Sequence, residues 1–186
     1  ASGLVLASLY MVRKERKLLA GILGASAFLM RFPAALIGPA VIIYYSMRFL
    51  RHRDLVKYVK GSALYTSGFM ALAVPYFLIN AYFYGNPLAP IVRGVAVPAS
   101  NPDTYLIGLY YLVGAIKSNP LHLALIPGVY MAYRNSREAF ELLAPATALY
   151  YLFFSVFPHK ETRFLLLFLP LISIFTAKGI VEACDR

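Results

Sequence analysis

The sequence predicts an all-α protein built as a polytopic bundle of transmembrane helices. Of its 186 residues, 60% are hydrophobic and only 14% are charged, against about 25% charged residues in a typical soluble domain. The mean hydropathy is +0.66, and a soluble domain of this length could not cover so much apolar surface. Disordered chains are poor in the aromatic and branched residues that are abundant here. The single cysteine, Cys184, excludes a disulfide scaffold.

The positive charge of the chain is distributed as expected for loops that flank membrane helices. The formal net charge is +10, from 18 Lys and Arg against 8 Asp and Glu. In a soluble protein this excess would suggest nucleic acid as a partner. Here the basic residues form short clusters between apolar runs, which is typical of membrane proteins. We therefore expect no nucleic-acid partner.

The first apolar runs predict short or broken helices. Residues 1–12 have the character of the tail of an apolar helix, so we expect the chain to be the C-terminal part of a larger protein. After the basic cluster at 13–17, the runs 18–30 and 34–47 would each form a helix of about 20 Å. This is less than the hydrocarbon thickness of about 30 Å. We predict two short or tilted helices that meet at Arg31-Phe32-Pro33.

Three later runs predict full spans, and a proline-rich region separates the first of them from the other two. Residues 62–84 form the first span, with Pro75 as a kink. Five of the 12 prolines lie between residues 87 and 120, which predicts irregular backbone that does not span the membrane. Within it, the Tyr-rich run 104–116 predicts an interfacial or re-entrant helix on the non-cytoplasmic side. The runs 139–157 and 164–181 predict two further spans.

Basic residues also orient the predicted helices. The positive-inside rule places the loops 13–17, 48–60 and 134–137, with the C-terminus, on the cytoplasmic side. The loops 85–103 and 158–163 then face the other side, and residues 104–133 must cross once. The protein is expected in the cell membrane of a prokaryote or the endoplasmic reticulum membrane of a eukaryote.

The loop 158–163 holds the densest cluster of charge between two apolar runs. Its sequence His159-Lys160-Glu161-Thr162-Arg163 places four ionisable side chains within five residues. Lys and Arg at a helix end can simply anchor it in the interface. Alternatively, a planar Arg fork beside a Lys point charge suits a phosphate group. The residues alone leave both interpretations open.

Residues 159–164 resemble the HKExRF motif of the dolichyl-phosphate-mannose-dependent mannosyltransferases, and all five specified positions match. The resemblance implies a helical membrane fold of the GT-C type. It implies transfer of a hexose, expected to be mannose, from a polyprenyl- or dolichyl-phosphate donor to a lipid-linked or protein-linked acceptor. It also implies that His159, Lys160 and Arg163 bind the donor phosphate while Glu161 orients them.

Two weaker resemblances extend the predicted site. The segment Tyr84–Pro90 resembles the Gly-Asn-Pro loop of GT-C enzymes, which makes Asn86 and Pro87 candidate site residues. The segment Phe28–Pro33 resembles a helix break in such chains, which makes Arg31 a further candidate. The family places its catalytic acid, usually Asp, in a first lumenal loop that residues 1–186 do not contain. We therefore expect the catalytic base upstream of Ala1.

The remaining candidates predict packing or another class of protein. His52 is interpreted as solvated and His122 as a local hydrogen-bonding group. The sequence contains no metal-ligand spacing and no nucleotide-binding loop, so neither a metal nor a cofactor is expected. The small residues between Ala20 and Ala27 predict close helix packing in lipid. Other Tyr and Phe side chains are expected to face lipid or the interface. The alternative is a non-catalytic membrane protein, either a transporter or an assembly subunit.

Overall fold

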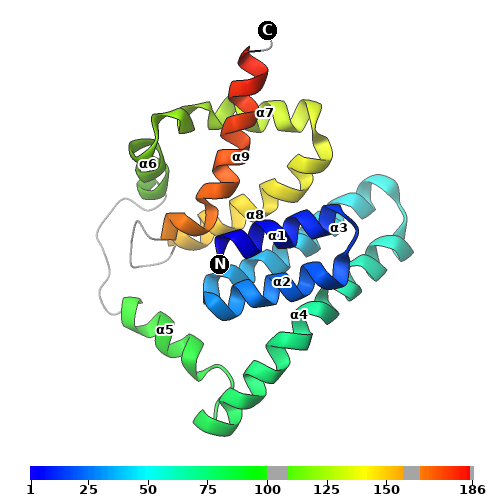
Figure 1. Ribbon diagram of the computed structural model, residues 1–186, viewed down its shortest axis with the longest axis vertical. Helices are drawn as coiled ribbons and strands as arrows, with labels where there is room; N and C mark the ends of the chain where they lie inside the picture. Colours follow the sequence, from blue (N-terminus) through cyan, green and yellow to red (C-terminus); the bar gives the residue numbers. More distant parts are fainter. Residues whose placement is uncertain (100–108, 157–163, 185–186) are drawn as a thin grey trace.

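The computed structural model describes residues 1–99, 109–156 and 164–184. Within these ranges the regular structure is helical, which confirms the predicted all-α class (Figure 1). The helices in chain order are α1 (Ser2–Arg13), α2 (Lys17–Met30), η1 (Phe32–Leu36), α3 (Ile37–His52), α4 (Leu55–Tyr84), α5 (Ala89–Ala99), α6 (Leu109–Ser118), η2 (Pro120–Ala124), α7 (Leu125–Asn135), α8 (Arg137–Val156) and α9 (Leu165–Cys184).

Four helical stretches in the described part of the chain are long and apolar enough to cross a membrane. They are Phe32–His52, Leu55–Tyr84, Arg137–Val156 and Leu165–Cys184. Three of them contain the predicted spans 62–84, 139–157 and 164–181 almost completely. The protein is therefore an integral membrane protein with a helical bundle.

Helix α2 packs against α1 on one side and α4 on the other (Figure 1). The Ser8 hydroxyl donates a hydrogen bond to the backbone carbonyl of Ala20 over 2.8 Å. Between α2 and α4 the backbones approach so closely that a Cβ on Gly21 would collide with the carbonyl oxygen of Tyr65. The predicted role of the small-residue run in helix packing is thereby confirmed.

The predicted break at Arg31 is present. Arg31 is extended, with φ −157° and ψ 113°, and it separates α2 from the short 3₁₀ helix η1. Of the two flanking helices that were predicted to be short or tilted, α2 is short, because its 14 residues span about 21 Å. Helix η1 continues directly into α3, so the second stretch has 21 residues and can span.

Helix α4 is longer than the predicted 62–84, because it begins inside the basic loop. The Asp54 side chain accepts a hydrogen bond from the Lys57 backbone N–H over 3.0 Å and caps the helix, which is the standard role of Asp before a first turn. The helix has 30 residues, contains Pro75, and ends at Tyr84, which is followed by Gly85 with φ +67°.

The predicted irregular backbone between residues 87 and 120 is wrong for residues 89–99, which form α5. Pro90 is the second residue of α5, and Pro120 begins η2. A helix has no intrahelical partner for its first N–H groups, so a proline there removes no hydrogen bond. Pro90 and Pro120, which were interpreted as helix breakers, therefore stand at helix starts.

Helices α5, α6 and α7 are all too short to cross the hydrocarbon core alone. They have 11, 10 and 11 residues, or about 15 Å each. The length of α6 agrees with a non-spanning 104–116, although residues 104–108 lie outside the described ranges. The predicted single crossing by 104–133 has no long helix to carry it within residues 109–133, and it stays a prediction.

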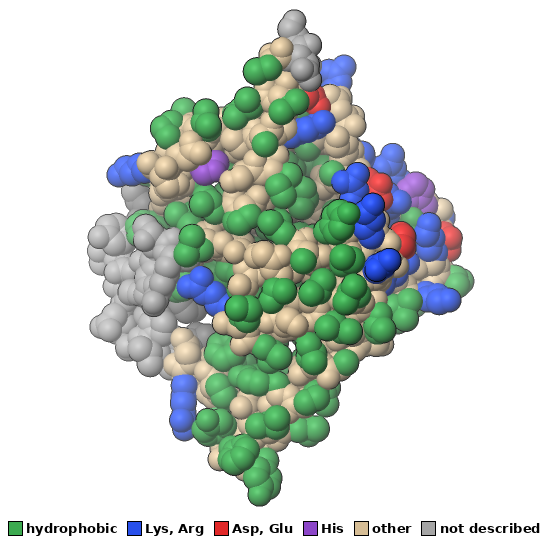
Figure 2. Space-filling view, viewed as in Figure 1, with side chains coloured by type: hydrophobic (Ala, Val, Ile, Leu, Met, Phe, Trp, Pro, Cys, Tyr) green, Lys and Arg blue, Asp and Glu red, His purple; other side chains and the backbone are tan. Residues whose placement is uncertain are grey.

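The loops predicted to be cytoplasmic come together at one end of the bundle, which we call the basic end. Arg48 pairs with Glu138 at 3.6 Å, which joins the end of α3 to the start of α8. Lys17 lies over the Tyr45 ring at 5.8 Å, and Asn135 donates a hydrogen bond to Glu182 in the last turn of α9. Figure 2 shows most of the visible Lys and Arg side chains at the right-hand edge, over these turns.

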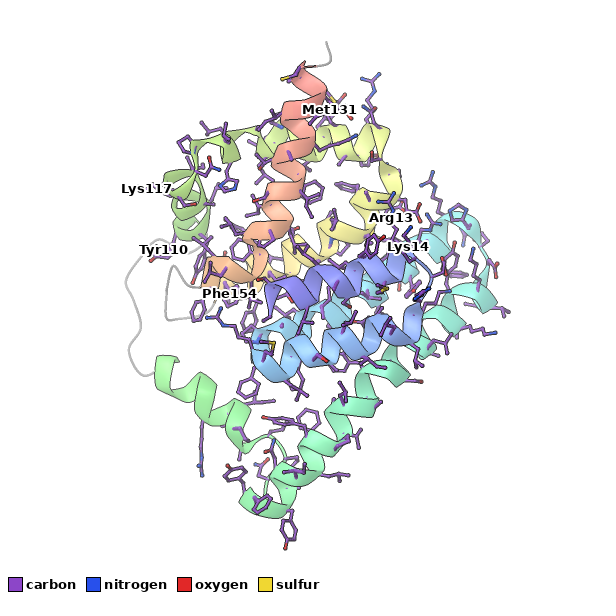
Figure 3. The ribbon with its side chains drawn as sticks, viewed as in Figure 1. Arg13, Lys14, Tyr110, Lys117, Met131 and Phe154 are labelled. Atoms are coloured by element: carbon purple, nitrogen blue, oxygen red, sulfur yellow. The ribbon has the colours of Figure 1, made fainter. Side chains whose placement is uncertain are left out.

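Residues next to the loops predicted to be non-cytoplasmic lie away from the basic end. Phe164 contacts Arg31, and a Cβ on Gly94 of α5 would lie 3.5 Å from the Phe32 ring. Figure 3 places Tyr110 and Phe154 on the opposite side of the view from Arg13 and Lys14. The described residues that flank these loops are therefore separated from the basic end, while the side of the membrane that each loop faces stays a prediction.

A cysteine-labelling experiment tests that orientation. In a chain with Cys184→Ser, which removes the one exposed thiol, we expect Ser100→Cys to react with a membrane-impermeant maleimide from the non-cytoplasmic side. Lys14→Cys, at the basic end, serves as the control and should react only after the membrane is permeabilised. Labelling of Ser100→Cys from the cytoplasmic side alone would contradict the orientation.

Candidate functional site

The candidate site lies where the helix break at Arg31 meets the start of α9. The Arg31 guanidinium lies over the ring of Phe164, 5.9 Å from its centroid. Phe164 is the last residue of the predicted HKExRF motif. The motif residues His159, Lys160, Glu161 and Arg163 lie outside the described residues, so their proposed roles are not tested.

Buried aromatic rings pack the end of α8 against the start of α9. Phe154, near the end of α8, stacks on Phe164 with centroids 4.9 Å apart and an interplanar angle of 12°. Tyr111 of α6 contacts Phe154 and Phe168 at 6.1 and 6.0 Å. Tyr111, Phe154 and Phe168 are almost fully buried, and Figure 3 shows Phe154 where α8 and α9 approach each other.

A hydrogen bond ties α8 to the segment that follows Arg31. The hydroxyl of Tyr150, which is fully buried, donates to the backbone carbonyl of Ala34 over 3.1 Å. Tyr150 lies one helical turn before Phe154, so one face of α8 contacts both η1 and Phe164. The position of Arg31 relative to the start of α9 is thus fixed by α8.

The described carboxylates lie at the basic end. Every Asp and Glu in the described ranges lies in or beside it: Glu15, Asp54, Glu138, Glu141 and Glu182. Glu161, the carboxylate of the predicted motif, lies outside the described residues.

The other predicted site residues, Asn86 and Pro87, lie in the turn between α4 and α5. The Asn86 side chain accepts a hydrogen bond from the Leu88 backbone N–H over 2.8 Å, a common arrangement in turns. Their part in the site stays a prediction.

The two described histidines have local partners. His122 Nδ1 lies 2.9 Å from the Ala115 carbonyl oxygen, and its Nε2 lies 3.4 Å from the Ser173 hydroxyl, as predicted for a local hydrogen-bonding group. His52 stacks on Tyr58 at 6.3 Å and is exposed. No group of metal-binding side chains occurs in residues 1–99, 109–156 and 164–184.

Sequence reasoning missed the aromatic cluster beside the motif. Tyr and Phe were expected at the lipid or interface, but Tyr150, Phe154 and Phe168 are buried inside the bundle. The signal was the spacing of four residues from Tyr150 to Phe154 and from Phe164 to Phe168, which places each pair on one helix face. Sequence reasoning also missed Glu141, a buried carboxylate at the basic end.

The arrangement brings one delocalised cation, Arg31, to Phe164, the last residue of the predicted motif. A guanidinium has the planar donor geometry that suits a phosphate group.

Comparisons with known proteins give one match. A model of the Alg9-like mannosyltransferase family matches residues 2–184. No curated protein and no solved structure matches the chain.

Proposed function

Because the chain belongs to the Alg9-like mannosyltransferase family, and is thus a membrane glycosyltransferase, we propose that it transfers mannose from a polyprenyl- or dolichyl-phosphate donor to a lipid-linked or protein-linked acceptor. We further propose that residues 1–186 form one membrane-embedded region of the GT-C type. The observation that carries the proposal is the contact of Arg31 with Phe164, at the end of a motif of that family.

In the proposed site the donor phosphate is bound by His159, Lys160 and Arg163, and Glu161 orients them. Arg31 adds a further cation beside Phe164. Charge-assisted hydrogen bonds from Arg to phosphate are short, directional and strong. The predicted non-cytoplasmic position of this loop would place the phosphate at the membrane surface while its prenyl tail stays in lipid.

The proposed reaction breaks the bond between C1 of mannose and the phosphate oxygen, and it forms a bond between C1 and an acceptor hydroxyl oxygen. The hydroxyl proton goes to a carboxylate base, which the family resemblance implies. The bonding electron pair leaves with the phosphate, which gains one negative charge. Lys160, Arg163 and Arg31 stabilise that charge as it develops, and such interactions lower the barrier of the chemical step.

The test is mannose transfer by the full chain in membranes, with polyprenyl-phosphate mannose and a nucleotide-linked mannose supplied in parallel. We expect transfer from the lipid donor, and activity with the nucleotide donor alone would contradict the proposal. Arg31→Ala should reduce transfer by roughly one to two powers of ten, because it removes one charge-assisted phosphate contact of about 1.5–3 kcal/mol.

Arg93→Ala is the matched control for Arg31→Ala. Arg93 lies over the Tyr84 ring at 5.7 Å, so it makes the same kind of ring contact as Arg31, away from Phe164. We expect Arg93→Ala to keep near-normal transfer at equal protein level. Equal losses in the two variants would mean that Arg31 acts only through its ring contact.

A further inference from the structure

A groove of about 760 Å³ opens at the basic end, where α3 and α7 end and α8 begins. Three arginines contribute to its lining, namely Arg51, Arg134 and Arg137, and one carboxylate does so, that of Glu141. The groove lies in the part of the bundle where the predicted cytoplasmic loops meet, away from the contact of Arg31 with Phe164.

The charges in the groove are arranged so that its positive side is accessible. Arg51 and Arg137 both bind Oε1 of Glu141, each at 3.2 Å. The Glu141 side chain is only 3% exposed, whereas those of Arg51 and Arg137 are 51% and 41% exposed. An anion in the groove would therefore meet guanidinium groups before the carboxylate. Three arginines against one glutamate leave an excess of two positive charges.

One of the arginines is fixed in place by an aromatic ring. The Arg137 guanidinium lies 4.0 Å from the centroid of the Tyr133 ring, and its Nε donates to Glu141. Arg134 is exposed beside it, in the last turn of α7. An oriented guanidinium loses less conformational freedom when it binds an oxyanion, and its planar fork matches phosphate geometry.

Apolar side chains line the groove next to these cations, at the level expected for lipid headgroups. Met47 and Leu50 belong to the lining, and Leu50 is 63% exposed. Arg51 is the second-last residue of the candidate span Phe32–His52, and Arg137 is the first residue of Arg137–Val156. Arg and Lys at the ends of spans lie near the membrane–water interface.

From this juxtaposition we propose that the groove binds the phosphate of an anionic phospholipid, with Arg51, Arg134 and Arg137 on the headgroup and Leu50 and Met47 against the acyl region. Basic pockets between helices are known to favour anionic headgroups. The apolar lining beside the cations favours a lipid over a free phosphate ion. This site is separate from the proposed donor site and does not depend on the proposed mannosyl transfer.

The test is lipid retention by the full chain, purified in detergent and offered phosphatidylglycerol and phosphatidylcholine at equal concentration, with bound lipid counted by native mass spectrometry. We expect selective retention of phosphatidylglycerol. Arg134→Gln should weaken that retention by about tenfold, the effect of losing one charged contact. Combined with Arg51→Gln, it should abolish the selectivity.

Two controls make the outcome specific. Arg13→Gln with Arg53→Gln removes two exposed cations of the basic end that do not line the groove, and it should leave retention unchanged. Arg51 contacts the buried Glu141, so the double variant could lose stability. A thermal unfolding curve is therefore recorded for each variant, and Arg134→Gln alone, which leaves the Arg51–Glu141 pair in place, keeps the test valid if the double variant unfolds.

Equal retention of the two lipids, or unchanged selectivity in both groove variants, would overturn the proposal. Full displacement of phosphatidylglycerol by millimolar inorganic phosphate would also overturn it, because the site would then bind free phosphate. If the full chain retains phosphatidylglycerol selectively but shows no mannose transfer, only the proposed function is contradicted.

Discussion

Replacement of Arg163 by Lys should reduce mannose transfer almost as strongly as replacement by Ala. If Arg163 binds the donor phosphate through two parallel N–H groups, Lys cannot reproduce that geometry even though it keeps the charge. The loss of one charge-assisted contact corresponds to about 1.5–3 kcal/mol, or roughly one to two powers of ten in rate. Lys160→Ala should have a loss of similar size. The measurement is mannose transfer in membranes at equal protein level.

The alternative interpretation of this loop, as an interfacial anchor, gives a different result. Lys occupies membrane interfaces as readily as Arg, so an anchoring Arg163 would tolerate Lys. Lys117→Ala, in the last turn of α6, is the control for the loss of a cation elsewhere in this half of the chain. Near-normal transfer by both Arg163→Lys and Lys160→Ala would contradict phosphate binding and support an interfacial anchor.

The second large effect is expected on stability, at the contact of α2 with α4. A Cβ on Gly21 would overlap the Tyr65 carbonyl oxygen, and a Cβ on Gly68 would overlap the Leu18 carbonyl oxygen. Both obstacles are backbone, which cannot rotate away, so Gly21→Ala or Gly68→Ala must push the helices apart. Overpacking of this kind costs about 3 kcal/mol. We expect a lower free energy of unfolding in detergent and a lower yield of folded protein.

Gly3→Ala provides the control for this effect. Gly3 lies in α1, and a Cβ there would meet no atom within 4 Å. Ala is the better helix former, so this change should be neutral or stabilise the protein by about 0.5–1 kcal/mol. Stability losses of equal size at Gly3 and Gly21 would show that the close approach of α2 and α4 is not the cause.

The sequence predicted those features that depend on local pattern. The apolar runs locate three of the four long helices, and Arg31-Phe32-Pro33 marks the break because Pro33 has no N–H to continue α2 and is suited to the start of η1. The early start of α4 could also have been predicted, because Asp54 precedes an apolar run as a helix cap does. Pro90 and Pro120 were misinterpreted because proline is suited to loops and also to helix starts.

Features that depend on contacts between distant segments could not be predicted. Nothing in the local sequence joins Arg31 to Phe164, or Arg51 and Arg137 to Glu141, since these pairs are made by the packing of α3, α8 and α9. The burial of Phe154 likewise depends on α6 and α9 lying against α8. In a membrane chain, apolar residues face both lipid and neighbouring helices, so hydropathy does not separate the two.

The stacking of Phe154 on Phe164 also bears on the entropy of the proposed donor site. Nine residues lie between the two rings, and bringing the ends of a free segment of that length together costs about 2 kcal/mol. The favourable free energy of burying the two rings in the bundle offsets that cost during folding, before a donor binds. Donor binding then need not supply the free energy of closing the loop, so more of the attraction between the cations and the phosphate remains available for affinity and for catalysis. Phe154 would in this way support transfer from a position where it touches neither sugar nor phosphate.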